Sequence, residues 1–333
     1  MKTKPTEHAR PARSKATRGL RRLMTERSNP ASRGLDLKNP LAVARIMNSE
    51  DAKVASSVRR ALPEIARAVE VIAQALARGG RLIYVGTGTS GRIAALDAAE
   101  CPPTFNTRPR AVQFVIAGGI RALGRAVESN EDSGAQGERD MARKKPGKTD
   151  VVVGIAASGR TPFTIAALRY ARRLGSRTVA VTCNPGSRLG QAAEIEIVTE
   201  VGAEIISGST RMKAGTAQKM VLNMLSSGAM IRMGYVFGNL MINVRPKNQK
   251  LAERALSILE DAAGVTRKVA RRALVRAENS VSLALIMLET GVGIVHAKRA
   301  LRSARGHVRS AIEDARGDPS PKVPSEASRR KSP

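Results

Sequence analysis

Five short apolar runs alternate with helix-forming segments through the middle of the chain. Each run is long enough for a strand, and helical segments such as residues 162–174 lie between most of them, which is typical of parallel strands joined by helical crossovers. The sequence therefore predicts an α/β fold, with a doubly wound, five-stranded parallel sheet flanked by helices on both faces. The five runs are residues 82–85, 112–117, 151–155, 178–182 and 195–198.

Helical periodicity precedes and follows this central pattern. Apolar residues recur at intervals of three and four over residues 54–76, which predicts an amphipathic helix ending at Gly79-Gly80. Pro63 lies inside this pattern and is expected to kink or split the helix. An earlier helix is expected to begin at Asn39-Pro40. Periodicity returns over residues 251–312, where a small helical bundle is predicted.

The two ends of the chain differ in composition from this core. Both are rich in Pro, Ser, Lys and Arg and poor in large apolar residues, so residues 1–24 and 313–333 are expected to be disordered basic tails. Between them we expect a sheet domain over residues 25–250 and a helical subdomain over residues 251–312. The formal charge of +29 leaves two roles open for the tails, solubilisation or non-specific contact with nucleic acid.

Composition also argues against several kinds of site and location. There is no apolar run of about 18 residues, and the basic amino terminus lacks an apolar segment, so we expect no membrane span, no secretory signal and a cytoplasmic location. His8, His296 and His307 all lie near the chain ends, which argues against a histidine triad or a metal site in the core. Cys101 and Cys183 have no metal-ligand spacing and are expected to be reduced thiols.

The first of the five runs leads into a glycine-rich turn, residues 86–91 (GTGTSG), and then into a helix. Glycines let the backbone approach an anion, and the helix directs unpaired N–H groups and a partial positive charge to the same point. Thr87, Gly88, Thr89 and Ser90 are therefore candidate phosphate ligands. The turn formally matches the dinucleotide pattern GxGxxG, but no acidic residue ends a second strand at the required distance, so a phosphate or sugar phosphate is favoured over NAD.

Two more hydroxyl-rich turns follow the third and fifth runs, and each opens a helix. Any one of their hydroxyls could be an ordinary helix cap. Because the carboxyl ends of parallel strands meet at one rim of a sheet, three such turns together indicate a binding site there. The added candidates are Ser158, Gly159 and Thr161 in one turn, and Ser209, Thr210 and the cation Lys213 in the other.

Longer strings resemble a known family. The turns GTGTSGR and ASGRTP resemble the sugar isomerase, or SIS, fold. The co-linear strings that follow resemble the N-acetylmuramic acid 6-phosphate etherases, and the match runs from about residue 25 to about residue 312. These strings are LDAAECPPTF (96–105), IAGG (116–119), NEDSG (130–134), GSTRMKAGTAQKMVLNML (208–225) and GNLMINV (238–244).

The resemblance implies an activity and a set of residue roles. Members of the family cleave the lactyl ether of N-acetylmuramic acid 6-phosphate as homodimers without a cofactor, and their small carboxyl-terminal helical part is UBA-like. By the family pattern, Glu100 matches the proton donor and Glu131 the second catalytic acid. Glu204 is expected either to orient the substrate or to cap the next helix. The turns at Ser90, Ser158 and Ser209-Thr210 match those that bind the sugar phosphate.

The chemistry of ether cleavage requires two acid–base groups. In the ring-opened sugar the aldehyde acidifies the hydrogen at carbon 2, so its removal and protonation of the oxygen at carbon 3 eliminate lactate. Water then adds to the unsaturated aldehyde. With no histidine in the core, carboxylates are the expected groups. Glu100 is expected to end the helix that starts at the first turn, beside Cys101-Pro102-Pro103, and Glu131 to follow a helix; which one is the base stays open.

Two other functions share the same turns. A non-catalytic regulator that senses a sugar phosphate, like the glucokinase regulatory protein, needs only the phosphate turns, and a phosphosugar isomerase also enolises at carbon 2. The presence of both Glu100 and Glu131 favours the etherase over the regulator. The ECPPTF and NEDSG strings favour it over the isomerase.

Overall fold

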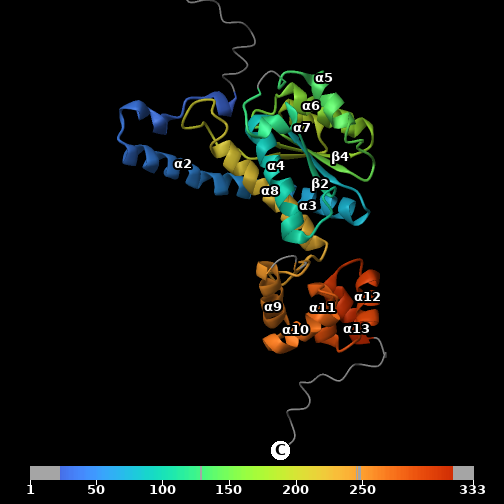
Figure 1. The fold of residues 1–333 in the computed structure, drawn as a ribbon. Coiled ribbons are helices and arrows are strands. Elements are labelled where there is room, and N and C mark those ends of the chain that lie inside the picture. Colours follow the sequence, from blue (N-terminus) through green and yellow to red (C-terminus); the bar gives the residue numbers. More distant parts are fainter. Residues whose placement is uncertain (1–22, 128–129, 245, 247–248, 318–333) are drawn as a thin grey trace, which may run out of the picture.

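The computed structural model describes residues 23–127, 130–244, 246 and 249–317 (Figure 1). Nearly all of the two expected basic tails lies outside the described residues. The predictions of disorder and of nucleic-acid contact concern these tails, so they also fall outside the described residues. Where the second tail was expected to begin, the last helix instead continues to Gly317, beyond residue 312.

The central sheet has five parallel strands in the order β2-β1-β3-β4-β5, which confirms the predicted fold class. The chain runs from β1 outward to β2 and then returns to β3 on the other side, so the direction of winding reverses between β1 and β3. Gly86 pairs in register with both Ile116 and Ile155, so the carboxyl ends of three strands are level at one rim. The strands are β1 (Leu82–Gly86), β2 (Val112–Ile116), β3 (Val151–Ile155), β4 (Arg177–Thr182) and β5 (Ile195–Val198).

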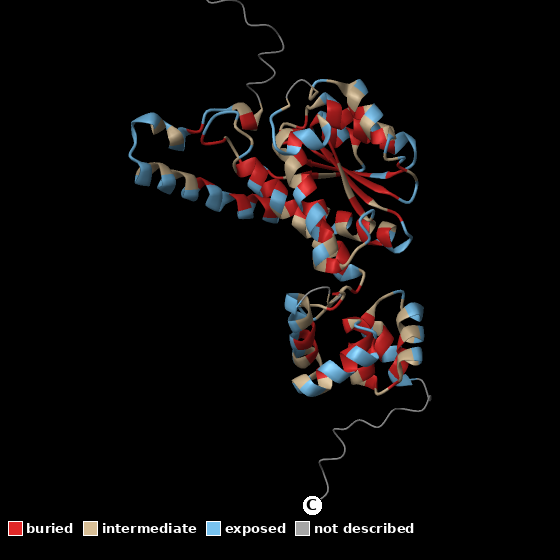
Figure 2. Ribbon diagram, viewed as in Figure 1, coloured by how far each residue is buried: buried red, intermediate tan, exposed pale blue. Residues whose placement is uncertain are grey.

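Helices cover both faces of this sheet (Figures 1 and 2). Alternate side chains of each strand point to opposite faces, so Leu82 and Tyr84 join one core cluster and Ile83 and Val85 the other. The first face carries α3 (Leu62–Ala77), α4 (Gly88–Phe105) and α8 (Lys213–Arg232). The second face carries α5 (Gly134–Ala142), α6 (Pro162–Arg173) and α7 (Arg188–Ala192).

The helix expected over residues 54–76 is split, as the proline predicted. Helix α2 (Pro40–Arg60) ends just before α3, and Pro63 lies in the first turn of α3, where its missing N–H has no helical partner to lose. The Asn39 side chain caps α2 by accepting a hydrogen bond from the Ala42 N–H. The first half of α2 projects from the sheet domain (Figure 1). The short helices η1 (Met24–Glu26), η2 (Pro30–Ser32) and η3 (Leu35–Leu37) come before α2 and lead the chain outward, and α2 then runs back to the sheet domain.

The carboxyl-terminal helices form a bundle with its own core, as expected. A two-stranded ribbon joins it to the sheet domain, and Asn243 after this ribbon donates a hydrogen bond to the Phe105 carbonyl (2.7 Å). Within the described residues no single helix is long and apolar enough to cross a membrane, and only the bent pair α11–α12 meets that test of length and composition together. The elements are β6 (Val236–Phe237), β7 (Leu240–Met241), α9 (Gln249–Ala263), α10 (Arg267–Arg276), α11 (Val281–Thr290), α12 (Ile294–Ser303) and α13 (Val308–Gly317).

Close packing of α5 on α6 depends on Gly137. A Cβ added there would lie 2.1 Å from the Phe163 carbonyl oxygen, which is backbone and cannot swing away. We expect Gly137→Ala to lower the free energy of unfolding by about 3 kcal/mol, measured by urea denaturation. Gly147→Ala is the matched control, because an added Cβ there has nothing within 4 Å. Equal stability of the two variants would contradict this packing.

Candidate active site

The first turn leaves the amino terminus of α4 open. Gly88 begins the helix with a φ of +49°, a conformation that glycine adopts without strain. The preceding Thr87 makes no side-chain capping bond. The hydroxyls of Thr87, Thr89 and Ser90 make no hydrogen bond to another described residue. The turn therefore offers unpaired helix N–H groups and hydroxyls to an anion.

The second turn lies beside the first, because β1 and β3 are adjacent. Gly159 has a φ of +65°, and a Cβ there would lie 2.3 Å from the Ser187 Cβ, so only glycine fits. The Ser158 hydroxyl accepts a hydrogen bond from the Arg160 N–H (3.2 Å), which fixes the turn. Thr161 precedes α6 without capping it through its side chain. Pro162 has no N–H and the Phe163 N–H donates to the Glu131 carbonyl, so this segment contributes to the rim through its turn and the hydroxyls of Ser158 and Thr161.

The third turn meets the first one through space. A Cβ on Gly215, in the first turn of α8, would lie 3.4 Å from the Thr89 Cγ2. Ser209 and Thr210 lie in the turn just before α8. The N-cap residue of α8 is Met212, and its side chain makes no capping hydrogen bond. The structure therefore brings the three predicted turns to one rim of the sheet.

Glu131 lies between the first two turns. Its Oε1 is 3.2 Å from the position that a Cβ on Gly88 would occupy. Its carbonyl oxygen accepts a hydrogen bond from the Phe163 N–H (3.1 Å) at the start of α6. Glu131 precedes α5 and is preceded by the 3-10 helix η4 (Gly119–Leu123). A carboxylate thus stands next to the open end of α4.

Glu204 and Lys213 have structural contacts in place of the expected contacts with a ligand. Both Glu204 oxygens accept hydrogen bonds from backbone N–H groups, those of Lys213 (3.0 Å) and Ala214 (2.9 Å). Glu204 is fully buried, and burial raises its pKa. Glu204 was expected either to orient the substrate or to cap the next helix, and these contacts are those of a cap on α8. The Lys213 ammonium is buried and donates to Glu50 Oε2 (2.7 Å).

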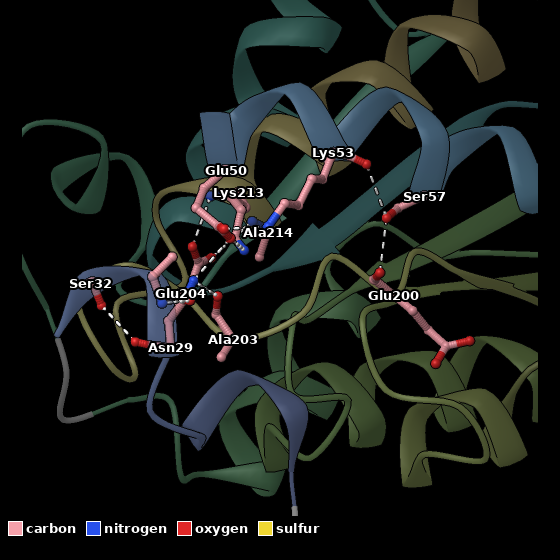
Figure 3. A network of polar contacts seen from close by, with 11 residues as sticks. Asn29, Ser32, Glu50, Lys53, Ser57, Glu200, Ala203, Glu204, Lys213 and Ala214 are labelled. Carbon is pink, nitrogen blue, oxygen red and sulfur yellow. Dashed lines mark hydrogen bonds and ion pairs between the residues drawn. The ribbon is translucent and has the colours of Figure 1, made fainter. Parts of the chain in front are cut away.

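The Glu50–Lys213 pair belongs to a network that ties α2 to the loop before α8 (Figure 3). Asn29 donates to Glu50 Oε2 and to the Ala203 carbonyl, each at 2.9 Å. Lys53 also pairs with Glu50. Sequence reasoning missed Asn29 and Glu50, because Glu50 lies 163 positions from its partner and the local pattern carries no signal for a contact at that separation.

Asn184 is a second residue that sequence reasoning missed. Its Nδ2 donates to the Ala157 carbonyl (3.0 Å), and its Oδ1 accepts from the Met24 N–H (2.9 Å). It follows β4, so it supports the second turn from the neighbouring strand and joins it to the amino-terminal segment. A polar residue directly after a predicted strand was the available signal.

Glu100 is far from Glu131 within one chain. It lies twelve residues beyond Gly88 on α4, which corresponds to about 18 Å along the helix axis. The prediction that this helix ends at Glu100 is wrong. It continues through Pro102 and Pro103 to Phe105. Burial of Cys101 and Phe105 in the core offsets the two backbone hydrogen bonds that the prolines cannot make. Glu100 is exposed and lines a groove of about 250 Å³ between α4 and α8.

The two cysteines are buried, and the residue types that bind metal ions are not clustered within the described part of the chain. Cys101 and Cys183 are buried free thiols, and burial raises the pKa of each to about 12. Such thiols stay protonated at neutral pH and are weak nucleophiles. No group of three His, Cys, Asp or Glu residues suited to a metal ion occurs among the residues that the structure covers.

Comparisons with known proteins agree with this geometry. A model of the SIS domain matches residues 132–227, and a model of the glucokinase regulatory protein N-terminal SIS domain matches residues 64–172. The N-acetylmuramic acid 6-phosphate etherase of Edwardsiella ictaluri is 49% identical over 88% of this chain and 97% of its own length. The chain belongs to the N-acetylmuramic acid 6-phosphate etherase family.

Other relatives extend the comparison. The etherase of Escherichia coli O1:K1 is also 49% identical, over 88% of this chain and 99% of its own length. A phosphoheptose isomerase from Francisella tularensis is 19% identical, with a TM-score of 0.43 over 55% of this chain and 96% of that chain. The etherase family and its SIS fold are thus as the sequence strings indicated.

The network beneath the third turn predicts an acid-sensitive stability for this etherase-family chain. Burial of Glu50 favours its neutral form, but hydrogen bonds from Lys213, Lys53 and Asn29 outweigh burial and lower its pKa to about 2. A lowered folded-state pKa adds stability above the unfolded value of 4.5, about 3 kcal/mol here, which is lost as the pH falls toward 2. Urea denaturation should show Glu50→Gln much less stable than wild type at pH 7, with the difference shrinking below pH 4.5. A pH-independent difference would contradict this role.

Proposed function

We propose that this protein cleaves the D-lactyl ether of N-acetylmuramic acid 6-phosphate to give N-acetylglucosamine 6-phosphate and D-lactate. It is a carbon–oxygen lyase, and relatives at about half sequence identity over most of the chain carry the etherase name. The observation that carries the proposal within the structure is the Glu131 carboxylate beside the open amino terminus of α4. A phosphorylated sugar does not cross a bilayer unaided, so we place the reaction in the cytoplasm.

The three turns supply the phosphate site. The open amino terminus of α4 directs N–H groups and partial positive charge to the rim, and Ser90, Ser158 and Ser209 add hydroxyl donors. None of these groups changes charge near neutral pH, so the site binds the phosphate without competing in acid–base steps. Thr87, Thr89, Thr161 and Thr210 complete the ring of hydroxyls around it.

Glu131 and Glu100 divide the proton transfers. Glu131 takes the hydrogen from carbon 2 of the open-chain sugar, and the electron pair forms the double bond to carbon 3 as the bond from carbon 3 to the lactyl oxygen breaks. Glu100 gives its proton to that oxygen, so D-lactate leaves with a neutral hydroxyl group in place of an alkoxide. Glu100, now a carboxylate, takes a proton from the water that adds to carbon 3, and Glu131 returns a proton to carbon 2.

A second copy of the chain brings the two glutamates together. Within one chain they lie at opposite ends of α4, too far apart to act on neighbouring carbons. Exposed apolar side chains flank both halves of the site, with Leu96 (52% exposed) beside Glu100 and Ile206 (52% exposed) before the third turn. A homodimer that joins the Glu100 groove of one protomer to the rim of its partner covers both and completes the site.

Removal of either carboxylate should abolish the chemistry. We expect Glu100→Gln and Glu131→Gln each to lower kcat by about 10²-fold to 10⁴-fold, with the fold unchanged by circular dichroism. In water enriched in oxygen-18, wild type should place the label on carbon 3 of the sugar and none in the D-lactate. Glu313→Gln, an exposed position of α13, is the matched control. Lactate release by a Glu100→Gln variant at the wild-type rate would remove Glu100 from the reaction.

Mixing the two inactive variants tests the shared site. Each mixed dimer combines Glu100 of one protomer with Glu131 of the other at one of its two sites, so random exchange restores about one quarter of wild-type activity. Native mass spectrometry measures the fraction of mixed dimers. If mixed dimers form and activity does not return, both glutamates act within a single chain and the shared site is wrong.

A further inference from the structure

The groove around Glu100 is built by one face of each of two helices. On α4, positions 93, 96, 97 and 100 share a face because they are spaced by three and four, and on α8 positions 219, 222 and 223 do the same. The groove therefore has an apolar part and a charged part. Its lining consists of Ile93, Leu96, Asp97 and Glu100 from α4, with Lys219, Leu222 and Asn223 from α8.

Two of the polar groups in this groove are already engaged in the fold. The buried Asp97 carboxylate accepts hydrogen bonds from Tyr84 Oη (2.7 Å), Asn223 Nδ2 (2.9 Å) and Ser226 Oγ (3.0 Å). Asn223 uses its amide in the same contact. This leaves Glu100 and Lys219 as the groups directed to a ligand, and both are exposed.

Lys219 is the one cation among the residues that line the groove. Its ammonium makes no hydrogen bond or ion pair with another described residue. Of the other two cations in residues 208–225, Lys213 is buried against Glu50, and Arg211 lies in the turn before α8 and does not line the groove. A strongly hydrated, flexible ammonium next to an exposed carboxyl group suits recognition of a small anion.

The substrate presents such an anion at this point. In the lactyl group the carboxylate carbon is bonded to the same carbon as the ether oxygen, so a donor that protonates this oxygen necessarily has the carboxylate within a few bonds. We propose that Lys219 binds the lactyl carboxylate and makes the site specific for an acidic ether, while Leu96 and the partly buried Ile93 contact the lactyl methyl group. This inference rests on the proposed role of Glu100.

Ligands that differ only in the lactyl group test the proposal. In the Glu100→Gln background, in which turnover is expected to be slowed by about 10²-fold to 10⁴-fold, calorimetry gives the Kd of N-acetylmuramic acid 6-phosphate and of N-acetylglucosamine 6-phosphate. Adding Lys219→Met should weaken the first by about tenfold to a hundredfold and leave the second unchanged. Lys219→Arg should recover most of the loss, because it keeps the charge. Lys268→Met, at an exposed position of α10, should change neither.

The outcomes separate this inference from the function beneath it. Equal weakening of both ligands would make Lys219 a structural residue, and unchanged binding of both would remove it from the site; either result overturns the proposal. Sustained heat from turnover in the Glu100→Gln background would instead show that the assigned role of Glu100 is wrong. In the active enzyme, Lys219→Met should raise KM for the lactyl substrate while lactate release still depends on Glu131.

Discussion

The parallel pairing of β1 with β3 is the constraint on which the site depends. Because the winding direction reverses between these strands, the helices that follow them leave the rim on opposite faces of the sheet, and their amino termini face a common space. The register sets Gly86 level with Ile155, so both turns begin at the same height. The open end of α4 therefore faces the turn after β3, and the proposed phosphate site depends on this arrangement.

The third turn reaches this rim by a different route. It follows β5, at the edge of the sheet, and α8 crosses back over the first face to pack against α3 and α4. Glu204 caps α8 from beneath, while the buried Glu50–Lys213 pair holds the start of α8 against α2. A buried pair of this kind contributes little net stability in itself, but loss of one partner leaves an uncompensated charge. The pair therefore fixes where α8 begins.

Helix α4 links phosphate binding to ether cleavage. Its open amino terminus belongs to the rim, and its far end carries Glu100 in the groove beside α8. The length of one rigid helix separates Gly88 from Glu100 within a chain, which is why the proposed reaction draws its two carboxylates from two copies of the chain. The same arrangement places Lys219 next to Glu100, because α8 runs along α4. In the proposed reaction, this one packed helix pair carries the leaving-group side of the chemistry.

The sequence by itself determined the strands to within a residue, the split at Pro63, the three turns and the family, since each depends on local composition or on a continuous string. The sequence did not determine which polar side chains stay free to bind a ligand and which are used in contacts within the fold. Lys213 was a candidate ligand, yet its ammonium is buried against Glu50, and of the two roles expected for Glu204 its contacts are those that cap α8. Likewise the helix beyond Glu100 continues through two prolines because Phe105 packs in the core. The burial of Lys213 depends on Glu50, 163 positions away, and only the folded chain brings the two residues into contact.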